Sequence, residues 1–256
     1  MNYPFLNVDF DNKRYKLLVD TGATNTLIFR FKNSLQNIQY AKRKWARYKT
    51  FLLPSFLKKV TFQFKNIKCS ASILIVDWHK YLVFAKSIIK NIQIYSYFQN
   101  TEYDGVLGLD LIRKVILKIN PKNNIAKLTN NLNCSKFYTL PLHLISNHIA
   151  VEMKINNKIK YALLDTGINV ADIVVKRKYK KCKLINKQQV LLWNNKKLIN
   201  IYDFEGNIHF LNENFKTLKL VVLKLTKTNN PIICYPFLKR FNNIILEKGK
   251  RLHIQS

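Results

Sequence analysis

The stretch Tyr15-Lys16-Leu17-Leu18-Val19-Asp20-Thr21-Gly22 decides the fold, because the chain repeats it as Tyr161-Ala162-Leu163-Leu164-Asp165-Thr166-Gly167. The two Asp-Thr-Gly triplets lie 165 − 20 = 145 residues apart. Each triplet ends an apolar strand, and each strand follows an alternating segment and a short turn, Asp11-Asn12 or Asn156-Asn157. This pattern predicts a β-hairpin that delivers an aspartate at its end, twice in one chain.

A second repeat lies downstream of each triplet. Val106–Lys114 matches Ile232–Arg240 in pattern, and both predict a buried strand that enters a short helix. Asp110 is placed to cap the first of these helices, and Pro236 suits the first turn of the second.

A third, weaker match joins Ile75–Phe84 to Ile201–Phe210, and both segments predict hairpins with polar tips. Three repeats in one order predict a duplicated chain with two similar lobes, 1–132 and 133–256. The fold class that we expect is all-β with a few short helices. Further segments that alternate or run apolar, and that we predict as strands, are Val60–Phe64, Ser70–Val76, Ile88–Tyr97, Tyr138–Leu144, Leu218–Leu225 and Ile244–Ile254.

The charge of the chain is extreme, with 44 Lys and Arg against 14 Asp and Glu, for a formal net charge of +30. Such a charge suits nucleic acid, anionic membranes or acidic partners. Residues 1–130 and 131–256 each contain 22 basic and 7 acidic side chains, so each half carries 22 − 7 = +15. A dedicated binding arm would make the halves unequal. We therefore favour compositional drift over a nucleic-acid partner.

Cysteine and histidine spacing predicts neither a metal site nor a cofactor. His79 and His209 occupy similar places in the third repeat but have no Cys or carboxylate companions at ligand spacing. Four scattered cysteines indicate free thiols. They are Cys69, Cys134, Cys182 and Cys234.

No apolar run reaches the roughly 18 residues of a membrane-spanning helix, so no transmembrane segment is expected. The start, Met1–Phe5, lacks the basic-then-apolar layout of a secretory signal. We expect a soluble chain, cytoplasmic by default. The second lobe has a lead-in strand that the first lobe lacks, which leaves an upstream targeting segment open.

The duplicated triplets, each followed by an apolar block that enters a helix, resemble the retropepsin and pepsin clan of aspartic peptidases. The resemblance covers most of both halves and is closest to two retropepsin-like lobes in tandem, since lobe one reads Asp20-Thr21-Gly22-Ala23-Thr24. It implies two β-barrel lobes of the acid-protease type in a monomer with pseudo-two-fold symmetry. It also implies an aspartic endopeptidase with a peptide or protein substrate, and Asp20 and Asp165 as its catalytic carboxylates.

Two facing carboxylates about 3 Å apart share one proton, because both cannot ionise. The ionised one activates a water, and the protonated one hydrogen-bonds the peptide carbonyl. By resemblance, Thr21 and Thr166 interlock their hydroxyls across the lobes. Gly22 and Gly167 allow the tight turn and let backbone N–H groups approach the carboxylates.

The tips of the third repeat are candidate flaps that would cover a bound substrate. Asp77 and Trp78 lie at the tip in lobe one, and Asp203, Phe204 and Gly206 at the tip in lobe two. The side chains of Trp78 and Phe204 could each contact substrate, or each could belong to the core.

Lobe two departs from the pattern of the family at two positions. Ile168 follows its triplet where the family has Ala, Ser or Thr, and Cys234 replaces the glycine that Gly108 provides in lobe one. A side chain at Cys234 is expected to crowd the active-site turn. A catalytically weak pseudopeptidase that binds peptides therefore remains the alternative. Neither Ala23 nor Ile168 offers a hydroxyl to an ionised carboxylate, so we expect an activity optimum between mild acid and neutrality.

Overall fold

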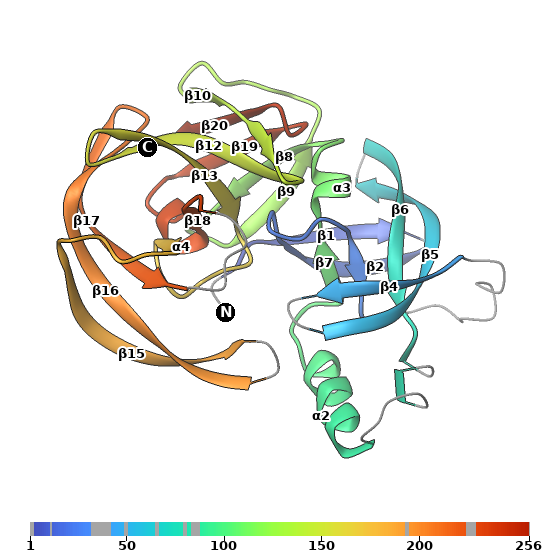
Figure 1. Ribbon diagram of the computed structural model, residues 1–256. Coiled ribbons are helices and arrows are strands. Elements are labelled where there is room, and N and C mark those ends of the chain that lie inside the picture. Colours follow the sequence, from blue (N-terminus) through green and yellow to red (C-terminus); the bar gives the residue numbers. More distant parts are fainter. Residues whose placement is uncertain are drawn as a thin grey trace.

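The computed structural model describes residues 3–10, 12–31, 42–48, 51–64, 67–78, 81–82, 88–192, 195–223 and 229–255. Most of these residues lie in β-strands, which confirms the predicted all-β class. Figure 1 shows the strands of the first half on the right, those of the second half on the left, and strands from both halves meeting near the top.

Six strands of the first half form a closed barrel. Strand β1 closes the ring by pairing with β5 through Asp9 and Gln63. Alternate side chains of β1 are buried, as expected when one face of a strand lines a core. Around the ring the strands are β1 (Phe5–Phe10), β2 (Lys13–Val19), β7 (Gly105–Leu107), β3 (Leu27–Ile28), β6 (Ile67–Val76) and β5 (Phe51–Phe64), with β4 (Lys42–Tyr48) added outside β5.

The second half repeats these pairings strand for strand. Strand β12 closes its ring onto β16 through Lys154 with His209 and Ile155 with Ile208. Around this ring the strands are β12 (His148–Ile155), β13 (Lys158–Asp165), β18 (Ile232–Cys234), β14 (Ile173–Val175), β17 (Glu213–Val222) and β16 (Asn195–Phe210), with β15 (Cys182–Leu192) outside β16 and β11 (His143–Ile145) outside β12.

The repeated hairpins were predicted correctly. Strands β1 and β2 pair antiparallel, and so do β12 and β13. Asn12, Asn156 and Asn157 have positive φ angles of 59°, 50° and 62°. Asparagine tolerates this left-handed conformation better than most residues, which is why Asx-rich turns join these strands.

A sheet shared by both halves joins the two lobes. Strand β8 (Ile116–Asn120) of the first half pairs antiparallel with β19 (Asn243–Glu247) of the second half, with Leu117 opposite Leu246. The sheet therefore crosses the boundary expected after residue 132, and the two-lobe organisation holds only loosely. The other strands of this part are β9 (Ile125–Thr129), β10 (Tyr138–Pro141) and β20 (Arg251–Gln255).

Short helices follow β7 and its counterpart β18, as the second repeat predicts. They are α3 (Leu109–Ile112) and α4 (Tyr235–Leu238), and Pro236 lies in the first turn of α4. Asp110 does not cap α3, because Gly108 occupies the N-cap. Its carboxylate instead accepts hydrogen bonds from the backbone N–H of Thr26 at 2.9 Å and from its hydroxyl at 2.7 Å.

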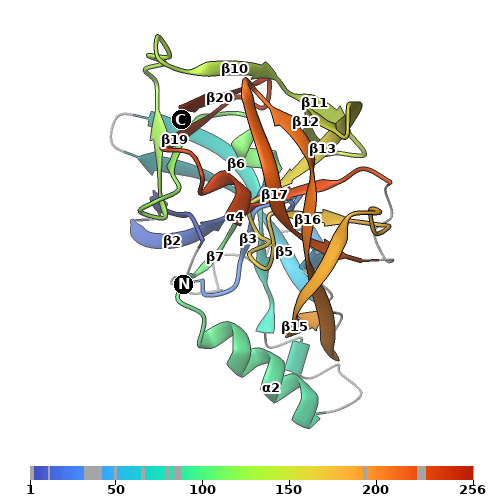
Figure 2. The ribbon, with the colours of Figure 1, turned by 90° about the vertical axis from the view of Figure 1, so that its left-hand side faces the viewer.

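Helix α2 (Ile88–Gln99) replaces a predicted strand, so the interpretation of Ile88–Tyr97 was wrong. Its β-branched residues favour a strand locally, but tertiary packing overrides this preference. Phe98 is buried against the first barrel, and the Thr101 hydroxyl lies 2.8 Å from the Phe98 carbonyl oxygen at the helix end. Figure 2 shows α2 projecting below the barrels. No helix in the described ranges is long and apolar enough to cross a bilayer.

The third repeat was aligned wrongly. Ile75 and Val76 end β6, whose counterpart in the second ring is β17, whereas Ile201–Phe210 belongs to β16, the counterpart of β5. Alternation along a strand does not reveal which neighbour it pairs with, so two long strands were confused.

Candidate active site

Each aspartate lies at the end of the second strand of its hairpin, beside β7 in lobe one and β18 in lobe two. Val19 is level with Leu107 on β7, and Asp165 is level with Cys234 on β18. The Asp20 N–H donates to the Leu107 carbonyl oxygen at 3.1 Å. The two rings bring the aspartates together, so that their carboxyl groups hydrogen-bond one another. Asp20 is 9% exposed and Asp165 is partly buried.

The triplet glycines make this approach possible. A Cβ atom on Gly22 would lie 2.3 Å from Oδ2 of Asp165, and one on Gly167 would lie 2.5 Å from Cγ of Asp20. Each glycine therefore packs against the carboxyl group of the opposite lobe. Only a residue without a side chain fits at either position.

Backbone amides of the turns point at the carboxylates. The N–H groups of Gly22 and Ala23 donate to Oδ1 of Asp20 at 2.9 and 3.2 Å. Gly167 N–H donates to Oδ1 of Asp165 at 2.9 Å. Burial is the main cause that raises the pKa of Asp165 well above its ordinary value, and the charge of the neighbouring Asp20 is the second. The backbone amides of Gly167 and Ile168 oppose this shift.

Thr21 and Thr166 lock the two turns together. The Thr21 hydroxyl donates to the Leu164 carbonyl oxygen at 2.8 Å, and the Thr166 hydroxyl donates to that of Val19 at 2.7 Å. Each hydroxyl also accepts the backbone N–H of the other threonine at 3.1 Å. Both side chains are buried, so four hydrogen bonds cross the lobe boundary directly beneath the carboxyl pair.

The active-site turns are also tied to the short helices in the same way in both lobes. Leu109 N–H donates to the Ala23 carbonyl oxygen at 2.8 Å, and Tyr235 N–H donates to that of Ile168 at 3.0 Å. Cys234 does not break this link, although a Cβ on Gly108 would lie 2.4 Å from the Asn25 backbone. The expected crowding is therefore not seen at the turn of lobe two.

An apolar cluster adjoins each triplet, and a long hairpin contributes to it. In lobe one, Ala46 of β4 and Leu53 of β5 share a cluster that Ala23 contacts. In lobe two, Ile199 and Ile201 of β16 share a cluster with Cys234, and Ile168 packs against it. Residues of β4 and β5 in lobe one, and of β16 in lobe two, thus pack in the clusters that adjoin the triplets. The third repeat does not identify these strands correctly, because it matches the end of β6 to β16 instead of matching β5 to β16.

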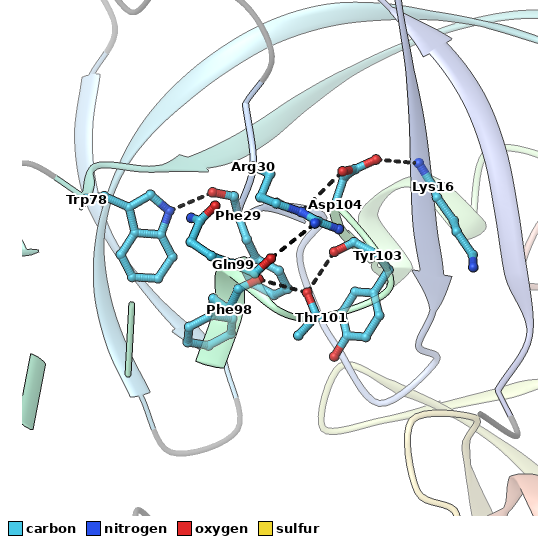
Figure 3. Close-up of polar contacts among 9 residues, drawn as sticks. All are labelled: Lys16, Phe29, Arg30, Trp78, Phe98, Gln99, Thr101, Tyr103 and Asp104. Atoms are coloured by element: carbon cyan, nitrogen blue, oxygen red, sulfur yellow. Dashed lines mark hydrogen bonds and ion pairs between the residues drawn. The ribbon is translucent and has the colours of Figure 1, made fainter. Parts of the chain in front are cut away.

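Asp77 and Trp78 do not lie at a hairpin tip. Asp77 follows β6, is buried, and donates its N–H to the Pro54 carbonyl oxygen at 2.7 Å. The Trp78 indole N–H donates to the Phe29 carbonyl oxygen at 2.6 Å, and its ring packs on Phe98. Figure 3 shows this indole directed inward, beside the network of Arg30 and Asp104. Both residues belong to the framework that holds α2.

Asp203, Phe204 and Gly206 lie within strand β16 rather than at its tip. Asp203 pairs with Lys183 and Lys219 on the two neighbouring strands, and Phe204 is 1% exposed in the core. Gly206 lies in a bulge, and a Cβ there would be 2.3 Å from the Phe204 ring. A glycine between Glu205 and Asn207 resembles a turn in sequence, but here it accommodates a buried ring.

A surface hollow of about 690 Å³ lies away from the carboxyl pair, beside β10, β12 and β16. Its lining includes His209 and Glu152 but neither catalytic candidate. Within the described ranges, no group of three or more His, Cys, Asp or Glu side chains is placed to hold a metal ion.

Comparisons with known proteins find no family model that matches the chain and no curated protein that matches its sequence. The paired aspartates with their glycines and threonines are therefore the basis of the functional assignment.

Proposed function

We propose that the protein is a single-chain aspartic endopeptidase of the retropepsin-like type, with Asp20 and Asp165 as its catalytic pair. The observation that carries the proposal is the hydrogen-bonded contact of two carboxyl groups from repeated triplets, each packed on the opposite glycine. Structural aspartates rarely meet in this way, because two buried carboxylates repel one another unless they share a proton.

The two carboxyl groups hold one proton between them, because both cannot ionise when they are in contact. The protonated group donates a hydrogen bond to the carbonyl oxygen of the scissile peptide. The ionised group takes a proton from the attacking water. The tetrahedral intermediate then collapses, and the leaving amine takes up a proton from the carboxyl pair. Peptide or protein segments in extended conformation are the substrates.

Cleavage of a peptide library between pH 3 and 8, with and without pepstatin, tests the proposal. We expect inhibitable cleavage by the wild type, and at least a thousandfold loss in Asp20→Asn and in Asp165→Asn. Asparagine preserves shape, so both variants should keep the thermal unfolding profile of a folded protein. Undiminished cleavage in either folded variant would overturn the assignment.

The second candidate is a peptide-binding module with little catalysis, favoured by the Cys234 side chain at the position of Gly108. The thiol lies close enough to Asp165 for the carboxylate to act on it, and burial strongly raises the pKa of the thiol. Tight binding of pepstatin by a wild-type protein that cleaves no library peptide would favour this candidate.

A further inference from the structure

Two residues outside the triplets occupy matching places beside the carboxyl pair. In the first hairpin Phe5 pairs with Leu18, so the register extended by two residues sets Tyr3 opposite Asp20. In the second hairpin Ala150 pairs with Leu163, so His148 falls opposite Asp165. Each residue precedes its aspartate by 17 positions, since 20 − 3 = 165 − 148 = 17.

Tyr3 faces both aspartates from the side of lobe one. Its side chain is half-buried against the apolar cluster that includes Phe98. Burial raises the pKa of the Tyr3 phenol, and the charges of Tyr97, Asp20 and Asp165 add to the rise. Tyr97 of helix α2, whose charge acts on Tyr3, is 37% exposed.

His148 faces the pair from the opposite side. It begins β12, where its partner on β11 is the apolar Ile145, and it is half-buried. Burial lowers the pKa of its imidazole, and Asp20 acts in the opposite direction. Asp20 is the charged group that acts on this ring, and it belongs to the other lobe. Cross-strand partners project from the same face of a hairpin, so His148 lies on the face that carries Asp165.

The pseudo-two-fold relation between the rings indicates which part of a bound peptide Tyr3 and His148 would each contact. A peptide laid across the carboxyl pair extends in both directions from its scissile bond, and the two directions meet equivalent surfaces of opposite lobes. Residues related by the pseudo-two-fold axis contact opposite halves of the peptide. Tyr3 and His148 are such a pair, one phenol and one imidazole.

We propose that Tyr3 and His148 are specificity-determining residues, and that in mild acid the His148 side prefers an acidic substrate residue that the Tyr3 side does not. This inference rests on the proposed function and names the substrate class of the same site. An imidazolium attracts a carboxylate, whereas a neutral phenol provides only a hydrogen bond and an apolar ring. Because burial disfavours the imidazolium, the preference is present in mild acid and absent above neutrality.

Matched peptides that carry Glu or Gln at each of three positions on either side of the scissile bond test the proposal. The measured quantity is the ratio of kcat/KM for Glu over Gln at pH 5.0 and at pH 7.5, in which the general pH dependence of catalysis cancels. We expect the ratio to be about three- to fivefold higher at pH 5.0 on one side of the bond only, the size of a partly exposed ion pair. His148→Gln should remove this rise.

The exchange variant that combines Tyr3→His with His148→Tyr should move the preference to the other side of the bond. His209→Gln is the matched control, since His209 lies on β16 beside the distant hollow, and it should retain the wild-type ratios. The inference would be overturned, and the proposed function left standing, if the rise in the Glu/Gln ratio at pH 5.0 survives in folded His148→Gln. The same holds if the rise appears equally on both sides of the scissile bond. If the folded wild type cleaves no peptide at all, the inference is overturned together with the proposed function.

Discussion

Gly22 lies so close to Asp165 that a Cβ atom at this position would be 2.3 Å from the carboxylate oxygen Oδ2, well inside van der Waals contact. The glycine of one lobe thus sets the position of the aspartate of the other. Gly167 and Asp20 repeat the relation from the other side. This mutual packing holds the pair in register, and its consequences are measurable.

Gly22→Ala should displace the Asp165 carboxyl group and lower kcat/KM by roughly a hundredfold or more, since small misplacements of catalytic groups are costly. Gly206→Ala is the contrasting variant, because its Cβ would meet the buried Phe204 ring far from the pair. It should lower the melting temperature while leaving kcat unchanged. Peptide-cleavage kinetics and thermal unfolding of both variants separate these effects. Full kcat in Gly22→Ala would contradict the packing described.

Thr21→Val should destabilise the junction of the lobes by about 2–4 kcal/mol, because the Leu164 carbonyl and the Thr166 N–H would both lose buried partners. Thr21→Ser keeps the hydroxyl and should lose much less. Thr61→Val is the control, since its hydroxyl pairs with Ser70 in an exposed position and its removal should cost under about 0.5 kcal/mol. Urea unfolding gives the three values. Equal losses in Thr21→Val and Thr61→Val would count against the network.

Asp165→Asn should gain stability relative to the wild type as the pH rises. The folded-state pKa of Asp165 is raised, so the folded protein holds this proton more tightly than the unfolded chain does. Stability is then greatest below the ordinary carboxyl pKa of 3.8 and falls as the pH rises toward the folded-state value. Asparagine does not titrate, so the Asp165→Asn variant does not lose this stability as the pH rises. The difference in melting temperature should widen from pH 4 to pH 7, and a constant difference would contradict the raised pKa.

The same raised pKa bears on the pH optimum of the proposed activity. The form with one shared proton persists to higher pH than an ordinary carboxyl pair allows. We expect the highest kcat/KM between mild acid and neutrality in the library assay. An optimum below pH 3 would refute this expectation.

Cys234→Gly should lower the free energy of unfolding by about 1–3 kcal/mol, because it empties a buried site and adds backbone freedom. The link between Tyr235 and Ile168 already has normal geometry, so restoring glycine should leave kcat within about threefold of the wild type. Cys234→Ala controls for loss of the thiol. A large gain in kcat for Cys234→Gly would mean that the cysteine restrains catalysis, as the peptide-binding alternative requires.

The sequence was most informative where local pattern and repetition agreed. The Asp-Thr-Gly hairpins and the strand-to-helix blocks were found because each contains a motif that appears twice with the same neighbours. Pro236 was placed correctly because proline fits the first turn of a helix. These short-range signals place Asp20 and Asp165 at the ends of equivalent strands, although only the fold brings their carboxyl groups into contact.

Features set by tertiary packing were not predictable in the same way. Gly206 resembles a turn residue, yet it accommodates the Phe204 ring in a bulge. Helix α2 has strand-like composition and is held by buried Phe98. Tyr3 and His148 carry no motif, and only their common spacing of 17 residues before the aspartates relates them. Such residues become visible once the register of both hairpins is known.

The pairing of β8 with β19 has a consequence for the order of events during synthesis. Lys118 of β8 pairs with Ile245 of β19, which is synthesised much later. The sheet that joins the lobes can therefore form completely only after β19 has left the ribosome. Contacts so distant along the chain also form slowly. A nascent chain that already contains both aspartates therefore still lacks β18, the strand beside Asp165, and β19, the strand that joins the lobes.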